Sequence, residues 1–334
     1  LCGGDHRASF PARGPFWQAV GLIMEQILLS VLMFGSLFAV LTLSLNLQYA
    51  RGGMINFGTV AYFAAGAYAY AIVTQEPPSG LDQYMLGFEA PWWVGFIAAG
   101  LASMAFALIT GWPTLRLRGE YLALTTFAFA EVLHSFLMNE RRIGNGTMGL
   151  SNVHRPETDW LGLPSSYVFA AAAMVLMLAT AALVARILNS PYGRAIDAIR
   201  DDEVAAQAVG KDVRRMRFQV FVLSAIPIGF AGALYAMITT LVNPELFSAE
   251  VTFFVWIALV LGGERTIAGA VLGTMALVGF QEIVRAIPFE TVRAAQIAAS
   301  IEHMLTGVLF ILILRWQPFE RMARRKAPLK EQDA

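Results

Sequence analysis

Residues 167–188 read YVFAAAAMVLMLATAALVARIL, and residues 190–210, which follow almost directly, read SPYGRAIDAIRDDEVAAQAVG. The first stretch is apolar and long enough to cross a bilayer, which takes a helix of about 20 residues because lipid offers the backbone no hydrogen-bond partners. Pro191 stops that span, since proline cannot continue a helix. The second stretch is polar and carries no further proline. The sequence therefore predicts a membrane span followed by a polar helix outside the bilayer.

The composition extends this prediction to the whole chain. Hydrophobic residues make up 57% of it and charged residues only 14%, which is too apolar for an ordinary soluble domain. We therefore predict an all-α, polytopic membrane protein. The clearest spans are residues 20–47, 54–74, 92–112, 121–138, 167–188, 218–241 and 297–314.

A further apolar region at residues 251–287 is interrupted by Gly262 and Gly263, so it is either one broken span or two short ones. The prediction is eight to nine transmembrane helices with a broken or re-entrant segment at these glycines. Around the transmembrane domain of residues 18–315 we expect an irregular N-terminal segment, 1–17, and a basic tail, 316–334. The polar loop within the domain spans residues 189–217.

Basic residues indicate the orientation, because Lys and Arg stay preferentially on the cytoplasmic side. Placing the 189–217 loop inside puts most of the 24 basic residues inside as well. The loop and the C-terminal tail are thus predicted to be cytoplasmic. For both to lie on the same side of the membrane, residues 251–287 must cross it twice. The net charge is zero, and the charged residues are expected to lie on different sides of the membrane. The charge therefore indicates no nucleic-acid partner.

Five residues of the polar loop recur at spacings of three and four, which predicts a single helical face. This face narrows from isoleucine to alanine and glycine, so another protein could approach it closely. The alternative is an amphipathic helix lying on lipid. Two aspartates followed by a glutamate argue against this alternative, because an anionic leaflet would repel them. The five residues are Ile196, Ile199, Glu203, Ala206 and Gly210.

Polar residues inside spans are the other candidates, since ionisable groups are costly at bilayer depth. Glu131 and His134, three apart in one span, would line or gate a substrate path, or would hydrogen-bond to each other and fix helix packing. Asn46 and Asn56 flank a turn with two glycines, where they would hold a broken helix or cap two helix ends. Both are also candidates for the substrate path, together with Glu131 and His134.

Glycines within spans predict close helix contacts, because small residues let two backbones approach. The clearest spacing is that of Gly269 and Gly273, four apart. The other glycines given this role are Gly58, Gly66, Gly229 and Gly232.

Catalytic and metal-binding chemistry is not indicated. The single cysteine, Cys2, excludes a disulfide within the chain and a cysteine-based metal site, and no phosphate-binding loop with the spacing GxxxxGK(S/T) occurs. We therefore expect no cofactor and no metal in this chain. An ion-coupled secondary transporter would need charged or unwound sites in two corresponding halves. An intramembrane enzyme would need a clustered nucleophile or metal motif.

The loop resembles the EAA-type cytoplasmic loop of the permeases of ATP-binding cassette (ABC) importers, in the form of the branched-chain amino acid permease family of the LivM type. The resemblance rests on GRAI at 193–196 and DEVAAQAVG at 202–210 and extends over most of the chain. Further matching blocks, in family order, are LSLNL at 43–47, GGMINFG at 52–58, FAAGAY at 63–68, LRLRGEYLALTT at 115–126, GNGTMGL at 144–150 and LGGERTIAGAVLG at 261–273.

The resemblance implies a permease subunit in the inner membrane of a bacterium, with ATP hydrolysed by a separate subunit. Two ABC ATPases in the cytoplasm, a second permease subunit and a periplasmic binding protein are the implied partners, with ATP bound by the ATPases. Branched-chain or other hydrophobic amino acids are the implied substrates, while similar permeases carry urea, short amides or small organic acids. The residues expected to couple to an ATPase are Gly193, Arg194, Glu203, Ala205, Ala206 and Gly210.

Overall fold

The computed structural model describes residues 15–77, 84–117, 119–158, 162–263 and 266–286, together with residues 304, 307, 308 and 311. The predicted all-α class is confirmed, since the two strands of this part have two residues each. Residues 1–14, most of the predicted span 297–314 and the basic tail 316–334 lie outside the described residues, so those predictions stay predictions.

The elements follow the apolar runs of the sequence closely, with ends set by prolines, glycines and capping side chains. The helices are α1 (Pro15–Asn46), η1 (Leu47–Arg51, a π-helical turn), α2 (Thr59–Thr74), α3 (Trp92–Thr114), α4 (Glu120–Asn139), α5 (Arg141–Gly144), η2 (Gly146–Met148), α6 (Ser165–Leu188), α7 (Pro191–Asp201), α8 (Glu203–Ala208), α9 (Val213–Thr239), η4 (Pro244–Phe247), α10 (Ala249–Gly262) and α11 (Ile267–Arg285). The strands are β1 (Leu150–Ser151) and β2 (Leu241–Val242), which pair antiparallel.

Within the described residues, seven helices are long and apolar enough to cross a membrane. Helix α2 is also apolar but has only 16 residues. The prediction of a regular span over 54–74 is therefore wrong at its start, because the chain is irregular from Gly53 to Gly58 and the helix begins at Thr59. The first residues of the predicted span therefore form a non-helical segment.

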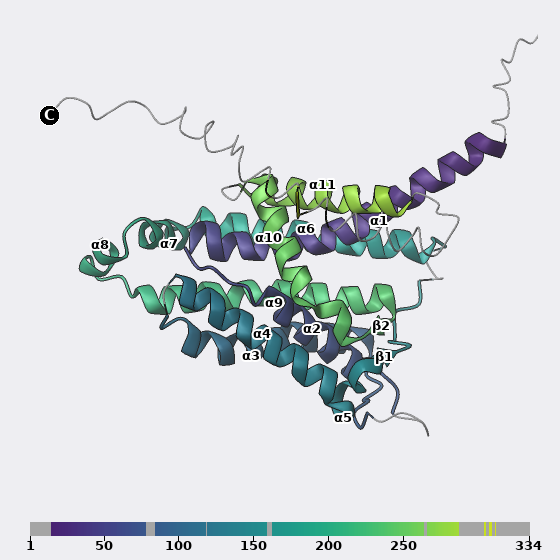
Figure 1. Cartoon of the computed structure of the whole chain (residues 1–334), viewed down its shortest axis with the longest axis horizontal. Coiled ribbons are helices and arrows are strands. Elements are labelled where there is room, and N and C mark those ends of the chain that lie inside the picture. The colour runs from purple at the N-terminus through teal and green to yellow at the C-terminus, as the bar shows by residue number, and fades with distance from the viewer. Residues whose placement is uncertain are drawn as a thin grey trace, which may run out of the picture.

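Two groups of helices form the body, as Figure 1 shows. Helices α1, α6 and α11 lie together along one side, and α2, α3, α4 and α9 along the other, with α10 crossing between them. The largest fully buried side chains include Tyr62, Tyr70 and Phe63 of α2 and Phe221 of α9. Helix α2 is thus the centre of the second group.

Glycines permit the closest helix contacts in this core, as the sequence predicted. A Cβ on Gly66 of α2 would lie 2.4 Å from the carbonyl oxygen of Gly229 on α9. A Cβ on Gly232 would lie 2.3 Å from the carbonyl oxygen of Phe63. Helices α2 and α9 therefore touch backbone to backbone.

The interrupted region 251–287 forms two helices, α10 and α11, rather than one broken span. Gly263, with φ +89°, ends α10 in a backbone conformation that glycine adopts readily. The two helices then pack closely, since a Cβ on Gly273 would lie 2.6 Å from the backbone nitrogen of Gly262.

The two ends of the molecule differ. Helices α7 and α8 project at one end, while β1, β2 and α5 lie at the opposite end (Figure 1). At the strand end, the Tyr70 hydroxyl donates to the carbonyl oxygen of His154 over 2.8 Å, and the Gln75 amide donates to that of Ser151 over 2.8 Å. These bonds fix the short loops there to α2.

Candidate functional site

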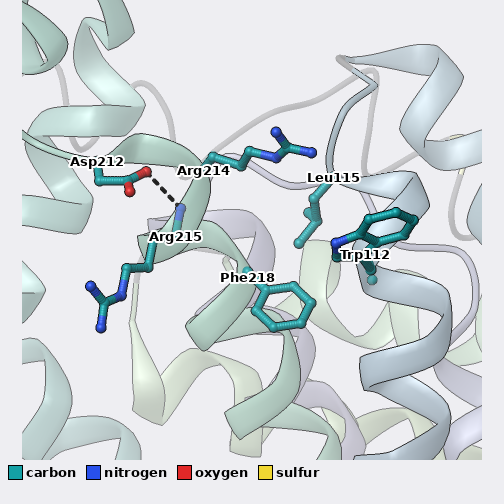
Figure 2. Close-up of a pocket in the computed structure, with 7 residues that line it drawn as sticks. Trp112, Leu115, Asp212, Arg214, Arg215 and Phe218 are labelled. Atoms are coloured by element: carbon teal, nitrogen blue, oxygen red, sulfur yellow. Dashed lines mark hydrogen bonds between the residues drawn. The ribbon is translucent and has the colours of Figure 1, made fainter.

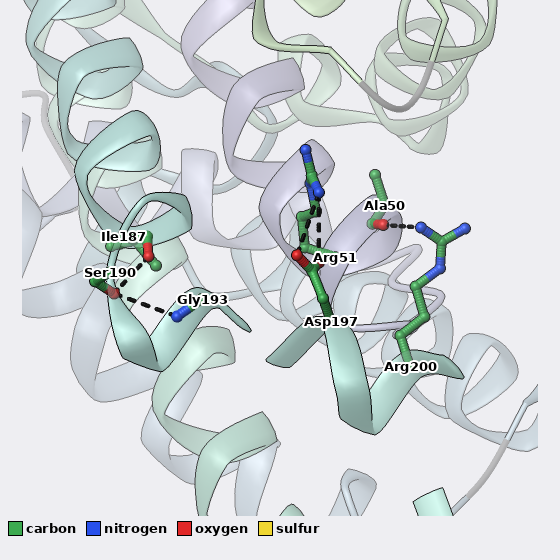
Figure 3. Close-up of polar contacts among 7 residues, drawn as sticks. All are labelled: Ala50, Arg51, Ile187, Ser190, Gly193, Asp197 and Arg200. Carbon is green, nitrogen blue, oxygen red and sulfur yellow. Dashed lines mark hydrogen bonds and ion pairs between the residues drawn. The ribbon is translucent and has the colours of Figure 1, made fainter. Parts of the chain in front are cut away.

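The projecting loop begins with a sharp turn from α6 into α7. The Ser190 hydroxyl accepts the Gly193 N–H over 3.2 Å and donates to the carbonyl oxygen of Ile187 over 2.6 Å (Figure 3). Pro191 occupies the first turn of α7, where its missing N–H costs nothing. A Cβ on Gly193 would lie 2.4 Å from the Ile187 carbonyl oxygen, so only glycine fits this turn.

Two short helices, rather than one, make up the rest of the loop. Asp202 leaves the helical conformation with φ −149° and ψ 105°, and its carboxylate accepts the N–H groups of Val204 and Ala205 over 2.9 and 3.0 Å. This is the side-chain capping that aspartate favours at a helix start. Gly210, with φ +80°, ends the second helix. Three polar caps therefore set the shape of the loop, the third being Asp212 at the start of α9.

The prediction that one helical face of this loop is free for a partner is wrong. The break at Asp202 separates α7 from α8, and Ile196, Ile199 and Ala206 are all buried against the chain itself. Ile199 and Ala206 form a small cluster with Val213 at the start of α9. The apolar face holds the loop to the body because burying it there removes it from water.

A different surface of α8 faces outward. Val204 is 74% exposed and Val209 75% exposed, and Ala205 and Gly210 beside them are exposed too. Exposed apolar residues on a small projecting helix provide a surface that a partner could bury. We call Val204, Ala205, Val209 and Gly210 the outer face of α8.

The other predicted loop residues occupy varied positions. Arg194 is exposed on α7. Glu203 is half-buried, and its carboxylate lies 3.1 Å from Nη1 of Arg217 on α9. This ion pair ties α8 to α9, so Glu203 acts within the chain.

Helix α7 is also tied to the π-helical turn η1 (Figure 3). Nη1 of Arg51 lies 3.4 Å from both carboxylate oxygens of Asp197, and Arg200 donates to the carbonyl oxygen of Ala50. The Arg200 side chain also packs beside Gly53, where a Cβ would lie 3.5 Å from its Cγ. π-Helical turns are rare and occur often at functional sites. Any shift of α7 would therefore act directly on η1.

A buried polar network follows η1. Asn56 Nδ2 donates to Oε1 of Gln48 over 2.8 Å, Gln48 Nε2 donates to the Ser224 hydroxyl over 2.5 Å, and Asn56 Oδ1 accepts the Gly58 N–H over 2.7 Å. Asn56 thus holds the irregular segment 53–58, the first of its two predicted roles. Asn46 is buried at the end of α1, and its side chain does not cap η1.

Side chains from other helices bond the backbone of the same segment. Trp256 of α10 donates to the Asn56 carbonyl oxygen over 3.0 Å, and the Thr126 hydroxyl of α4 accepts the Phe57 N–H over 3.0 Å. The Thr252 hydroxyl accepts the Val60 N–H over 3.2 Å. Non-helical backbone survives at bilayer depth only where such partners are available.

Glu131 and His134 both lie half-buried on α4, apart from this network. The Nε2 atom of His134 is buried and has no hydrogen-bond partner among the described residues. The two residues remain candidates for the substrate path.

Sequence reasoning missed Gln48, Ser224 and Trp256. Gln48 and Ser224 are polar residues within apolar runs, which is a signal, but they are 176 positions apart and nothing in the sequence pairs them. Asp197 and Arg200 are not among the five residues of the predicted face, and their contacts with η1 were not anticipated.

Comparison with known proteins identifies the family. The model of the family described as "Branched-chain amino acid transport system / permease component" matches residues 27–314, most of the chain. The chain belongs to this family. It is therefore a transport permease and not itself an enzyme, which removes the alternative of an intramembrane enzyme.

Named relatives agree with the family. The high-affinity branched-chain amino acid transport system permease protein LivM of Escherichia coli K12 is 30% identical over 317 residues, covering 88% of this chain and 69% of the relative. A probable LivM of Methanocaldococcus jannaschii is 25% identical over 86% of this chain and 91% of its own. LivH of E. coli K12 is 26% identical over 297 residues, which cover 85% of this chain and 90% of LivH. No solved structure matches the chain.

Proposed function

We propose that this chain is a permease subunit of an ABC importer for branched-chain or other hydrophobic amino acids. The relatives just described are named for branched-chain amino acid transport, which supports the substrate class. Permeases for urea, short amides or small organic acids are the alternative within the same family. The substrate would be selected mainly by a periplasmic binding protein.

The observation that carries the mechanism is the projecting loop with its exposed outer face of α8 and its ties to η1. Two cytoplasmic ATPases would bind ATP in each complex and act on the coupling loops of its two permeases, this loop being one of them. The Arg51–Asp197 ion pair would then pass their movement to η1 and on to the irregular segment 53–58. This chain needs no cofactor of its own for that role.

A second, related permease subunit would complete the path. LivM and LivH of E. coli K12 are both named as permease proteins of a high-affinity branched-chain amino acid transport system, and this chain resembles both. A pair of non-identical permeases is therefore the proposed arrangement. Asn46, Asn56, Glu131 and His134 are its proposed path residues in this chain.

The proposed location is a bacterial inner membrane, with α7, α8 and the C-terminus in the cytoplasm. Basic residues gather at the α7 end, as the preference of Lys and Arg for the cytoplasmic side requires. Those on or beside α3, α6, α7, α8 and α9 at this end are Arg116, Arg186, Arg194, Arg200, Lys211, Arg214, Arg215 and Arg217.

Reconstitution tests the function. The complete complex, isolated through a tag on this chain and placed in vesicles with its binding protein, should take up leucine only when ATP is supplied to the α7 side. Uptake driven by an ion gradient without ATP would contradict the importer. ATP-driven uptake of urea or an organic acid, with none of leucine, would replace the substrate class and leave the importer standing.

Reversing one charge of the link should uncouple this complex. Arg51→Asp places like charges beside Asp197, and we expect uptake per ATP hydrolysed to fall roughly fivefold, in line with an interaction of about 1 kcal/mol for a half-exposed pair. The double variant Arg51→Asp/Asp197→Arg should recover most of the loss. Both rates are measured in the same vesicles.

The matched control is the ion pair of Arg285 and Glu282, which has the same 3.4 Å separation and lies on α11 away from the loop. Arg285→Asp should leave uptake per ATP unchanged. Equal losses in both single variants, or no recovery in the double variant, would show that the Arg51–Asp197 pair is not a specific link.

A further inference from the structure

A cavity of about 210 Å³ lies where the end of α3 meets the start of α9, at the C-terminal end of the 189–217 loop and apart from the outer face of α8 and the buried network. Its apolar lining is formed by Trp112, Leu115 and Phe218, with Gly111 behind them. Arg214 and Arg215 supply positive charge (Figure 2). The cavity therefore combines an apolar wall with a cationic rim.

One guanidinium group of the cavity lining extends toward Trp112, and a second one, outside the lining, contacts the Trp112 ring. Arg214 extends from α9 toward Leu115 and Trp112, whereas Arg215 points away from them (Figure 2). The guanidinium carbon of Arg116 lies 4.2 Å from the centre of the Trp112 ring, stacked over it. Neither Arg214 nor Arg116 has an acidic partner among the described residues.

The one carboxylate of the lining does not neutralise this side. Asp212 accepts the backbone N–H of Arg215 over 3.0 Å as the cap of α9, and in Figure 2 it lies across the cavity from Trp112. An anion beside Arg214 and near Arg116 would thus meet two positive charges that no carboxylate of the described residues neutralises.

An exposed apolar stripe leads along α3 to this cavity. Its members recur at helical spacing on one face, and Trp112, 64% exposed, ends the stripe at the cavity. The other members are Trp93, Ile97, Leu101 and Leu108. Tryptophan commonly marks the level of the lipid headgroups, so the stripe spans the hydrocarbon layer and the cavity lies at its boundary.

We propose that this cavity binds an anionic phospholipid of the leaflet on the α7 side, with its phosphate between Arg214 and Arg116 and an acyl chain along the α3 stripe. Guanidinium groups match phosphate oxygens in geometry and charge. Basic pockets between transmembrane helices are known to select anionic headgroups. The continuous apolar stripe favours a lipid over a free phosphate ion.

Lipid retention by the purified full-length protein tests the proposal. After delipidation in detergent, titration with phosphatidylglycerol followed by native mass spectrometry should show one lipid bound at least tenfold more tightly than phosphatidylcholine. The Arg116→Gln/Arg214→Gln variant should weaken phosphatidylglycerol binding roughly 30-fold. The control variant Arg142→Gln/Arg155→Gln removes the same charge at the opposite end and should bind as the unmodified protein does.

Several results would overturn this assignment. They are equal binding of the two lipids, an unchanged affinity in the cavity variant, and displacement of phosphatidylglycerol by millimolar inorganic phosphate that itself binds. Melting temperatures are compared first, and if the cavity variant does not fold, the headgroup comparison on the unmodified protein decides alone. A stripe covered by a second permease would show as lipid binding that vanishes in the assembled complex, which also contradicts the proposal.

Discussion

Gly66→Ala should leave little folded protein, although it adds a single methyl group. The new Cβ would lie 2.4 Å from the carbonyl oxygen of Gly229 and 2.5 Å from its Cα, and both are backbone atoms that no rotamer change can move. Separating α2 from α9 would disturb the most densely packed part of the core. We expect a loss of about 3 kcal/mol or more, at the upper end for overpacking. The yield of monodisperse protein and its melting temperature in detergent measure it.

Gly279→Ala is the matched control, since it is also a glycine within an apolar helix. There the nearest atoms to a Cβ are the methyl groups of Val31 at 4.0 Å, so the alanine fits. Alanine favours a helix over glycine by about 1 kcal/mol, and this variant should be as stable as the parent or slightly more so. Similar melting temperatures for the two variants would contradict the close contact of α2 with α9.

The sequence predicts the membrane helices well because lipid imposes one requirement on all of them. Any span must satisfy its own backbone hydrogen bonds, so apolar length alone locates it. Gly66 and Gly229 were also predicted to lie at close helix contacts, and they do. Their mutual contact was not predictable, because a glycine indicates a close approach but not which helix approaches it.

The outward surface of the loop was predicted wrongly for a physical reason. A spacing of three and four defines one face only if the helix is continuous, and the cap at Asp202 divides it. The preference of aspartate for helix starts was available in the sequence, and it would have suggested the break. The inward turn of Ile199 and Ala206 depends on Val213 and Met216 of α9, which local periodicity does not report.

The irregular segment beside η1 also depends on contacts that the sequence does not reveal, here between residues far apart in the chain. Gly52 and Gly53 indicated a break, and holding a broken helix was one of the two roles predicted for Asn56. The groups that satisfy its backbone come from α4 and α10, far away in the chain. Only the folded structure brings Thr126 and Trp256 to this segment.

Val204→Arg and Val209→Arg, each alone, should abolish stable binding of the ATPase. Both valines are about three-quarters exposed on the outer face of α8, and neither belongs to the buried cluster of the loop. Loss of an apolar contact at the centre of an interface typically costs at least about 2 kcal/mol, or roughly 30-fold in affinity. The readout is the amount of ATPase that co-purifies with the tagged chain, followed by ATP-driven uptake.

Position 209 is a sharper test than Gly210, because the φ of +80° at Gly210 would strain any other residue and confuse lost docking with a distorted loop. Leu163→Arg is the control, since Leu163 is also exposed and apolar but precedes α6 at the opposite end of the molecule. It should retain the ATPase in full.

Because Val204 and Val209 make no contribution to the core, both variants should keep the parent's melting temperature. If they do so and still retain the ATPase, the outer face of α8 is not the docking surface, and the energy of ATP hydrolysis must enter this permease elsewhere.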